Sequence, residues 1–300
     1  MFWRKARNDS DTEGFSFGRY RVVSMLGEGA MATVYLADDP VLNRKVAVKV
    51  IHPHLASINL WARFRTEAKT AASLRSPNIV EVFDYGTQNE RQYLVLEYID
   101  GPSLHSVLNA RDGHPLEARD CAAIICQAAE GLAIAEKHGV VHRDVKPANM
   151  MFTTEGVLKI ADFGLAHINE QNLTMTGSLL GSPGYMSPEQ IEGGPPTSQT
   201  DMFSLGVVLY CCLCGCRPFA STNMAGLMRD ICDLPHLPVL EVVPAAAPEL
   251  ASLAEILLHK KPVERGGGAR WLALQLRTFL GQNGVFDPAG HCRELLSTMK

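Results

Sequence analysis

The chain carries one run of polar residues whose types and spacing suit chemistry on a hydroxyl group. This run reads HRDVKPAN and spans residues 142–149, with a carboxylate at Asp144, a cation at Lys146 and an amide at Asn149. If the loop turns back on itself, these three side chains converge. Asp144 can then accept a proton from an acceptor hydroxyl, Lys146 can neutralise a transferred phosphoryl group and Asn149 can bind a metal ion.

A second acidic motif follows after Asn149, at the end of a predicted strand. It consists of Asp162, Phe163 and Gly164. Asp162 suits Mg²⁺, which prefers hard oxygen ligands and often takes only one or two protein carboxylates together with phosphates. The two motifs together predict a phosphoryl-transfer site, in which positioning and charge neutralisation provide most of the catalysis.

A glycine-rich run, GEGAMATV at residues 27–34, lies between two predicted strands near the start of the chain. Glycines let the backbone approach phosphates closely and present N–H donors to them. On its own a G-x-G pair is more often a tight hairpin. A strand rather than a helix follows it, so it differs from the dinucleotide-binding βαβ signature.

One strand later, the run Val-Ala-Val-Lys ends at Lys49. A lysine in this position is usually a surface residue, but here it follows the glycine-rich run by one hairpin and could hold phosphates. Glu67, on a predicted helix over residues 61–74, could pair with Lys49 and orient it. Taken alone, Glu67 is an ordinary solvated helix residue.

Hydrophobic periodicity predicts the elements that would position these residues. The first hundred residues resemble a small sheet with one inserted helix, and the rest is mainly helical. Strands are expected at 20–26, 34–37, 46–51, 79–83, 93–98, 150–152 and 157–160, and helices at 61–74, around 124–135, and at 199–214, 247–260 and 270–280. The proline-rich segment 234–248 is expected to be a loop.

The order and spacing of these motifs resemble those of eukaryotic-type (Hanks-type) serine/threonine protein kinases, and more specifically a bacterial-like subgroup. The resemblance implies an α+β, two-lobed protein-kinase fold over residues 19–280. A small antiparallel β-sheet lobe with one helix would occupy 19–98, and a larger, mainly α-helical lobe 99–280. Residues 1–18 would be a flexible segment and 281–300 a C-terminal tail.

The same resemblance assigns roles to individual residues. The catalytic set would be Asp144, Lys146, Lys49 and Glu67, and the Mg²⁺ ligands Asn149 and Asp162. The expected ATP contacts lie in the glycine-rich run and around an adenine pocket behind a gatekeeper, Leu96. They are Leu26, Gly27, Glu28, Gly29, Ala30, Met31, Ala32, Thr33, Val34, Ala47, Lys49, Glu97 and Ile99.

The resemblance also implies control by phosphorylation and one structural ion pair. Arg143 before the catalytic Asp144 suggests an activation loop ordered by phosphate, with Thr174 and Thr176 as candidate phosphosites. Arg265 would pair with Glu189. The three glycines that follow Arg265 stand where such kinases usually begin a helix, which puts the local order there in question.

Composition excludes some other classes of protein. A net charge of −4 and a pI near 6.2 do not resemble a nucleic-acid binder. The longest uncharged apolar run, residues 202–216, is shorter than the ~20 residues of a transmembrane helix, and no secretory signal is evident. Four of the eight cysteines crowd into 211–216 without metal-site spacing, so they are expected to be buried free thiols. A cytoplasmic protein is expected.

The favoured function is transfer of the γ-phosphoryl group of ATP to serine or threonine hydroxyls of proteins, regulated by activation-loop autophosphorylation in a transient homodimer. A scaffold with the same fold but no activity would usually lack one of Lys49, Asp144, Asn149 or Asp162. A small-molecule kinase would lack the long segment 162–189 that shapes a peptide-binding surface. Both remain the alternatives.

Overall fold

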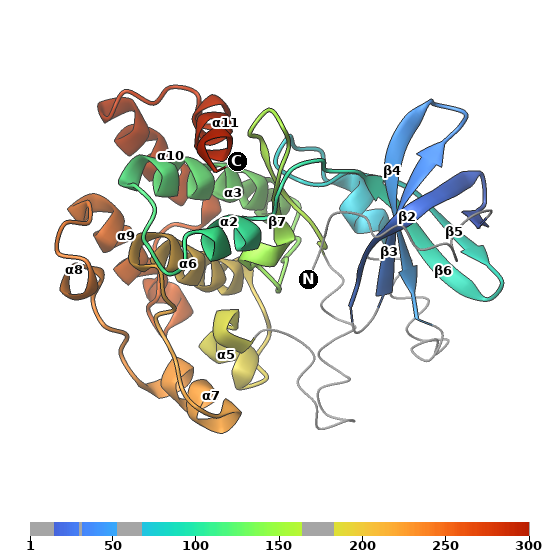
Figure 1. Ribbon diagram of the computed structural model, residues 1–300. Helices are drawn as coiled ribbons and strands as arrows, with labels where there is room; N and C mark the ends of the chain where they lie inside the picture. Colours follow the sequence, from blue (N-terminus) through green and yellow to red (C-terminus); the bar gives the residue numbers. More distant parts are fainter. Residues whose placement is uncertain (1–14, 30–31, 53–67, 164–182, 300) are drawn as a thin grey trace.

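The computed structural model describes residues 15–29, 32–52, 68–163 and 183–299 (Figure 1). A twisted antiparallel sheet forms one lobe, and a bundle of helices forms the other. The chain crosses between the lobes after β6, and the two-stranded β7–β8 ribbon lies on the helical side of the junction. This is the two-lobed α+β architecture that the sequence predicts.

The small lobe is a six-stranded sheet in the order β1-β2-β3-β4-β6-β5, with every neighbouring pair antiparallel. Its strands are β1 (Ser16–Phe17), β2 (Tyr20–Glu28), β3 (Ala32–Asp39), β4 (Arg44–Ile51), β5 (Val82–Gln88) and β6 (Arg91–Glu97). Between β4 and β5 the chain leaves the sheet, and the described part of the predicted helix 61–74 is helical at 68–73. The chain then returns at the sheet edge, so β4 pairs with β6.

Strand β4 shows how the sheet separates a structural face from a functional one. Successive side chains of a strand point to opposite faces. Val46, Val48 and Val50 pack into one apolar cluster, whereas Ala47 joins a second cluster on the opposite face. Lys49, two residues after Ala47, therefore shares the face of Ala47.

The large lobe is built around α3 and α6. Its elements are α2 (Leu104–Ala110), α3 (Ala118–Lys137), β7 (Met150–Phe152), β8 (Leu158–Ile160), α5 (Pro188–Ile191), α6 (Ser198–Cys214), α7 (Met224–Asp233), α8 (Val239–Val242), α9 (Pro248–Leu257), α10 (Ala269–Gln282) and α11 (Pro288–Thr298). Helix α6 is buried from Thr200 to Cys214, because its sequence after the first turn is apolar on nearly every face. It ends at Gly215, whose φ of +70° suits a glycine after a helix.

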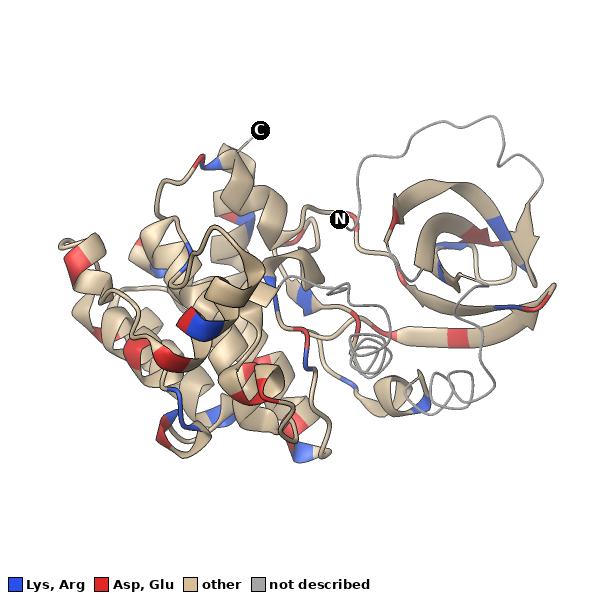
Figure 2. Ribbon diagram, turned by 90° about the horizontal axis from the view of Figure 1, so that it is seen from below, with Lys and Arg blue, Asp and Glu red and all other residues tan. Residues whose placement is uncertain are grey.

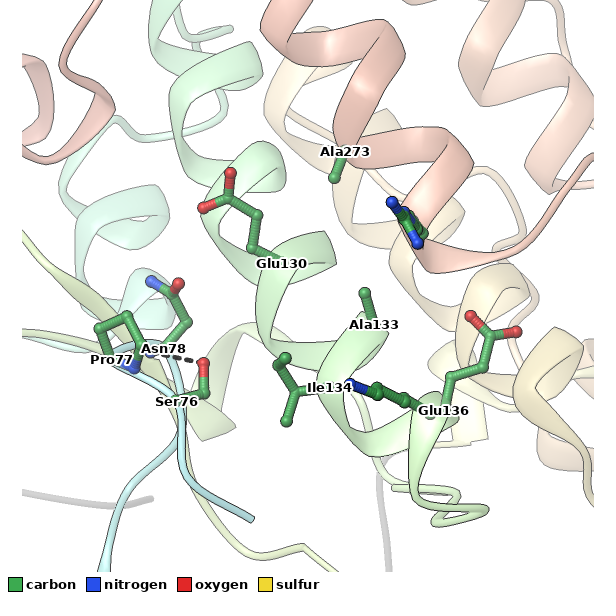
Figure 3. Close-up of a pocket in the computed structure, with 10 residues that line it drawn as sticks. Ser76, Pro77, Asn78, Glu130, Ala133, Ile134, Glu136 and Ala273 are labelled. Carbon is green, nitrogen blue, oxygen red and sulfur yellow. Dashed lines mark hydrogen bonds between the residues drawn. The ribbon is translucent and has the colours of Figure 1, made fainter.

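The loop that precedes β5 fastens the small lobe to the large one. The backbone carbonyl of Asn78 accepts a hydrogen bond from Ile160 N (2.9 Å), and its side chain donates to Leu158 O (2.9 Å). A cavity of about 610 Å³ lies between this loop, α3 and α10, with Asn78, Ile134 and Ala273 among its walls (Figure 3). None of the residues predicted to do chemistry lines this cavity.

Most predicted elements are confirmed, including the helices at 199–214, 247–260 and 270–280. The strand expected at 79–83 begins three residues later, and Ile79 makes only an isolated bridge to Ile160. The expected loop 234–248 contains the short helix α8.

The predictions for the two ends of the chain were partly wrong. Residues 16–17, expected in a flexible segment, form β1, and Phe17 is buried against Tyr93. Residues 288–298, expected in a tail, form α11, which packs on α3. Its His291 lies 2.8 Å from Asp120 of α3, and its Cys292 is fully buried. The sequence did not predict α11, because its hydrophobic periodicity is weak and only a narrow stripe of the helix is apolar.

Among the described residues no helix combines the length and the apolar character needed to cross a membrane. Acidic and basic residues are interspersed over the helical lobe (Figure 2).

Candidate active site

The loop of residues 142–149 brings its three polar side chains together as its spacing predicts. Lys146 Nζ lies 2.9 Å from Asp144 Oδ1 and 2.7 Å from Oδ2. Asn149 Nδ2 donates to the backbone carbonyl of Asp144 (2.8 Å) and to its Oδ2 (3.1 Å). Asp144 and Lys146 are partly exposed, with side-chain exposures of 29% and 14%, so a substrate can reach the carboxylate.

A buried carboxylate in α6 holds this loop in place. Asp201 accepts hydrogen bonds from the backbone N–H of His142 (2.8 Å) and of Arg143 (2.7 Å). These bonds support Arg143 at a φ of +68°, which is unusual for a residue with a side chain. Burial raises the pKa of Asp201, while the two N–H donors and the nearby positive charges oppose that rise. The anchoring role of Asp201 follows from these three-dimensional contacts.

Helix α5 supports the loop from a second side. Its N-terminus is capped by Ser187, which forms a reciprocal capping box with Gln190. Gln190 also donates through Nε2 to the backbone carbonyl of Arg143 (2.9 Å). The loop is therefore tied both to α6 and to α5.

Asp162 lies beside the loop and pairs with the strand lysine of the small lobe. Lys49 Nζ lies 2.7 Å from Asp162 Oδ1, and both side chains are nearly buried. Two hydrogen bonds also join the residue before Asp162 to the loop of residues 142–149. Ala161 N donates to Asn149 O (2.8 Å), and the His142 ring lies 2.8 Å from Ala161 O. Asp162 itself has a φ of +66°, a second unusual conformation at the site.

The donor set near Asp162 fits Mg²⁺. Asn149 Oδ1 is a buried acceptor that has no hydrogen-bond partner within the described part of the chain, and the carboxylate of Asp162 adds a hard oxygen ligand. The described residues contain no group of three or more His, Cys, Asp or Glu side chains that could hold a metal. A site with few protein ligands is typical of Mg²⁺, which takes the rest from phosphates and water.

The residues predicted to line an adenine pocket belong to one apolar cluster with members in both lobes. It contains the predicted residues Leu26, Val34, Ala47, Leu96 and Ile99, all at most 8% exposed. The cluster also contains residues that sequence reasoning missed, namely Leu36, Ala68, Val80, Leu94, Met151 and Ala161.

Met151 was not predicted as part of the adenine pocket, although its place on strand β7 could have indicated it. Strand β7 alternates, so that Met150 and Phe152 belong to the core of the large lobe while Met151 belongs to the cluster that spans both lobes. Met151 lies two residues after Asn149 on a predicted strand, and strand alternation could have placed it on the face opposite to Met150 and Phe152.

The other predicted contacts lie around this pocket. The glycine-rich run closes the end of the β2–β3 hairpin, with Gly27 opposite Val34, Glu28 opposite Thr33, and Gly29 N donating to Ala32 O (2.9 Å). Glu97 ends β6, and its carboxylate lies 2.9 Å from Lys159 Nζ.

Several predicted residues lie outside the described part of the chain. They are Ala30, Met31, Glu67, Thr174 and Thr176. The pairing of Lys49 with Glu67 and the phosphosites therefore stay predictions.

The predicted Arg265–Glu189 ion pair is confirmed, with both guanidinium Nη atoms 2.7 Å from the two carboxylate oxygens. The glycines after Arg265 are ordered. Gly266 and Gly268 adopt φ values of +81° and +84°, and Gly268 is the N-cap of α10. A Cβ on Gly266 would lie 2.6 Å from the Trp271 ring, so the small residue permits this close packing.

A two-lobed fold with a loop that joins a carboxylate, a cation and an amide, a nearby Mg²⁺-suited carboxylate, and an apolar cluster between the lobes is typical of phosphoryl-transfer proteins. Residues 20–275 match the model of the protein kinase domain family. The chain belongs to this family.

Curated relatives are bacterial serine/threonine kinases. The chain is 38% identical over 265 residues to the probable serine/threonine-protein kinase pknA2 of Bifidobacterium longum, covering 85% of this chain and 35% of that relative. It is 40% identical over 204 residues to the serine/threonine-protein kinase PrkC of Bacillus subtilis (67% and 31%). It is 39% identical over 256 residues to the serine/threonine-protein kinase PknA of Mycobacterium tuberculosis (83% and 58%). The chain thus spans about a third to just over half of these relatives.

Among solved structures, the PknI kinase domain of Mycobacterium tuberculosis is similar, with a TM-score of 0.70 and 27% sequence identity. The similarity covers 88% of this chain and 97% of that domain. The chain is therefore of the Hanks type, with relatives among the bacterial serine/threonine kinases.

Proposed function

We propose that the chain is an ATP-dependent protein kinase that phosphorylates serine and threonine hydroxyls of proteins. The observation that carries the proposal is the convergence of Lys146 and Asn149 on the carboxylate of Asp144, on a loop tied to α6 by Asp201. A scaffold protein needs no such convergence, and the bacterial relatives are named serine/threonine kinases.

In the proposed reaction Asp144 orients the acceptor hydroxyl and takes its proton. Lys146, 2.7 Å from that carboxylate, places a positive charge where the transferred phosphoryl group passes. Asn149 and Asp162 would hold Mg²⁺, which neutralises phosphate charge when bound. Lys49 would contact the α- and β-phosphates from the sheet face that it shares with Ala47.

ATP would bind with its adenine ring in the apolar cluster between the lobes. Leu26, Val34 and Ala47 would enclose the ring, and the backbone groups of Glu97 and Ile99 would bind its polar edge. The glycine-rich run would cover the phosphates. Burial of this cluster in both lobes supports the assignment, since cofactor pockets are mostly apolar with a few polar groups.

The proposal includes regulation of the kinase by autophosphorylation at Thr174 and Thr176 in a transient homodimer. It rests on Arg143, which precedes the catalytic carboxylate and whose charge could pair with a phosphate. A cytoplasmic location is consistent with eight free cysteines.

The acceptor residue is tested by incubating purified protein with Mg²⁺, γ-labelled ATP and a mixture of protein substrates, followed by phosphoamino-acid analysis. We expect label on serine and threonine. Label confined to tyrosine, or found only on small molecules, would refute the proposal.

A further inference from the structure

One arginine packs against the turn that precedes helix α5 and has no role in the proposed phosphoryl transfer. Arg217 follows the end of α6, and its guanidinium carbon lies 5.2 Å from the centroid of the Tyr185 ring. Tyr185 belongs to a short 3₁₀ turn, Pro183–Tyr185, which directly follows the segment that ends at residue 182. A guanidinium that packs against an aromatic ring keeps the N–H groups that point away from the ring available for other partners.

Two contacts place this turn next to the catalytic loop. Ser204 Oγ of α6 donates to the carbonyl of Tyr185 (2.7 Å), only three positions after Asp201, which holds the loop. Three positions along a helix correspond to a rise of about 4.5 Å. Gln190, five positions after Tyr185, reaches the carbonyl of Arg143. The Tyr185 turn and the Asp144 loop are thus held side by side by the same elements.

The positive charge of Arg217 is exposed, and its described side-chain partner, Tyr185, is not a carboxylate. Its side chain lies in an exposed position, and none of the carboxylates in the described part of the chain forms an ion pair with it. The neighbouring residue of the turn is Gly184. A Cβ there would lie 3.2 Å from Arg217 Nη1, so the absence of a side chain leaves room for the guanidinium.

We propose that Arg217 is a specificity-determining residue that favours acceptor peptides with an aspartate or glutamate close to the phosphorylated serine or threonine. This inference rests on the proposed kinase function. Because α5 and α6 contact both the Tyr185 turn and the Asp144 loop, a peptide whose hydroxyl reaches Asp144 would run close to that turn. A carboxylate on that peptide can pair with the exposed guanidinium, which offers two parallel N–H donors.

The test uses synthetic peptides with one serine and a single glutamate placed at each flanking position in turn, each matched to a peptide with glutamine at that position. With the wild-type protein we expect kcat/KM to be about 1.5- to 5-fold higher for the glutamate peptide at one or more positions, the range of an exposed ion pair. The difference should appear mainly in KM.

Three variants separate a charge effect from a structural one. Arg217→Gln should bring the glutamate-to-glutamine ratio to about 1, and Arg217→Glu should invert it. Arg91→Gln, at an exposed arginine that begins β6 in the other lobe, is the control and should keep the wild-type ratio.

Inversion by Arg217→Glu is an outcome that simple loss of structure cannot produce. Phosphorylation of all peptides with a wild-type ratio of 1, or an unchanged preference in Arg217→Glu, would overturn this inference alone. A wild-type protein that phosphorylates no peptide would overturn both this inference and the proposed function.

Discussion

The buried ion pair between Glu189 and Arg265 offers a sharp test of what stabilises the large lobe. Arg265 is fully buried, and all five of its N–H groups are used. Two reach the Glu189 oxygens at 2.7 Å, and the others reach backbone carbonyls of His259 (2.8 Å), Gln199 (2.9 Å) and Lys260 (2.7 Å). Glu189→Gln preserves the shape but removes the countercharge and turns an N–H₂ group toward the guanidinium.

Removing one partner of a buried ion pair costs about 3–5 kcal/mol. Glu189→Gln should therefore lower the unfolding free energy by that amount and the Tm by roughly 6–20 °C, measured by urea and thermal unfolding. Glu130→Gln is the control. Glu130 pairs with Arg277 at 2.6 Å, but that arginine is 43% exposed, so the loss should stay below about 1 kcal/mol. Equal losses in the two variants would refute the reasoning.

The same pair predicts a pH dependence. Burial alone would raise the pKa of Glu189, but the hydrogen bonds and charge of Arg265 outweigh it, and the pKa lies below the usual 4.5. A carboxyl whose folded pKa is lowered stabilises the protein above the unfolded pKa and loses that contribution as pH falls. The stability difference between wild type and Glu189→Gln should therefore shrink below about pH 4.5. A difference that grows on acidification would contradict this account.

Three further changes test the site and its supports. Asp201→Asn should lower kcat roughly 10- to 100-fold, the value of hydrogen bonds to a charged group, with little change in the KM for ATP; an unchanged kcat would remove its anchoring role. Asn149→Ala should raise the Mg²⁺ concentration for half-maximal rate about 10-fold or more, and EDTA should abolish transfer in wild type; an unaltered Mg²⁺ titration would exclude Asn149 as a ligand. Gly156→Ala would place a Cβ 2.1 Å from the Ala289 carbonyl of α11 and should cost about 3 kcal/mol or more in urea unfolding. Gly139→Ala, at a φ of +68° in open space, should cost only about 1–2 kcal/mol, and equal costs would show that α11 does not dock as described.

Local spacing predicted the parts of the site that lie within one loop or one strand. The convergence around Asp144 follows from the distances between its residues along the chain, and the face of Lys49 follows from strand alternation. Helix α6 was predictable because an unbroken apolar run has few other solutions.

Contacts between distant segments were not predictable in the same way. Asp201 accepts hydrogen bonds from two backbone N–H groups, and Arg217 packs against Tyr185. Neither contact leaves a periodic pattern in the sequence, because both depend on the packing of separate elements. Helix α11 escaped detection because its buried side contains Cys292, a proline and few large apolar residues.

The central claim is that Asp144 acts on the acceptor hydroxyl and does not serve to bind nucleotide. The most direct measurement compares Asp144→Asn with wild type in single-turnover phosphate transfer and in ATP binding. We predict a transfer rate reduced about 100- to 10,000-fold, the contribution of a positioned general base, with nearly unchanged ATP affinity. A transfer rate close to that of wild type, or a loss explained entirely by weaker ATP binding, would contradict the account.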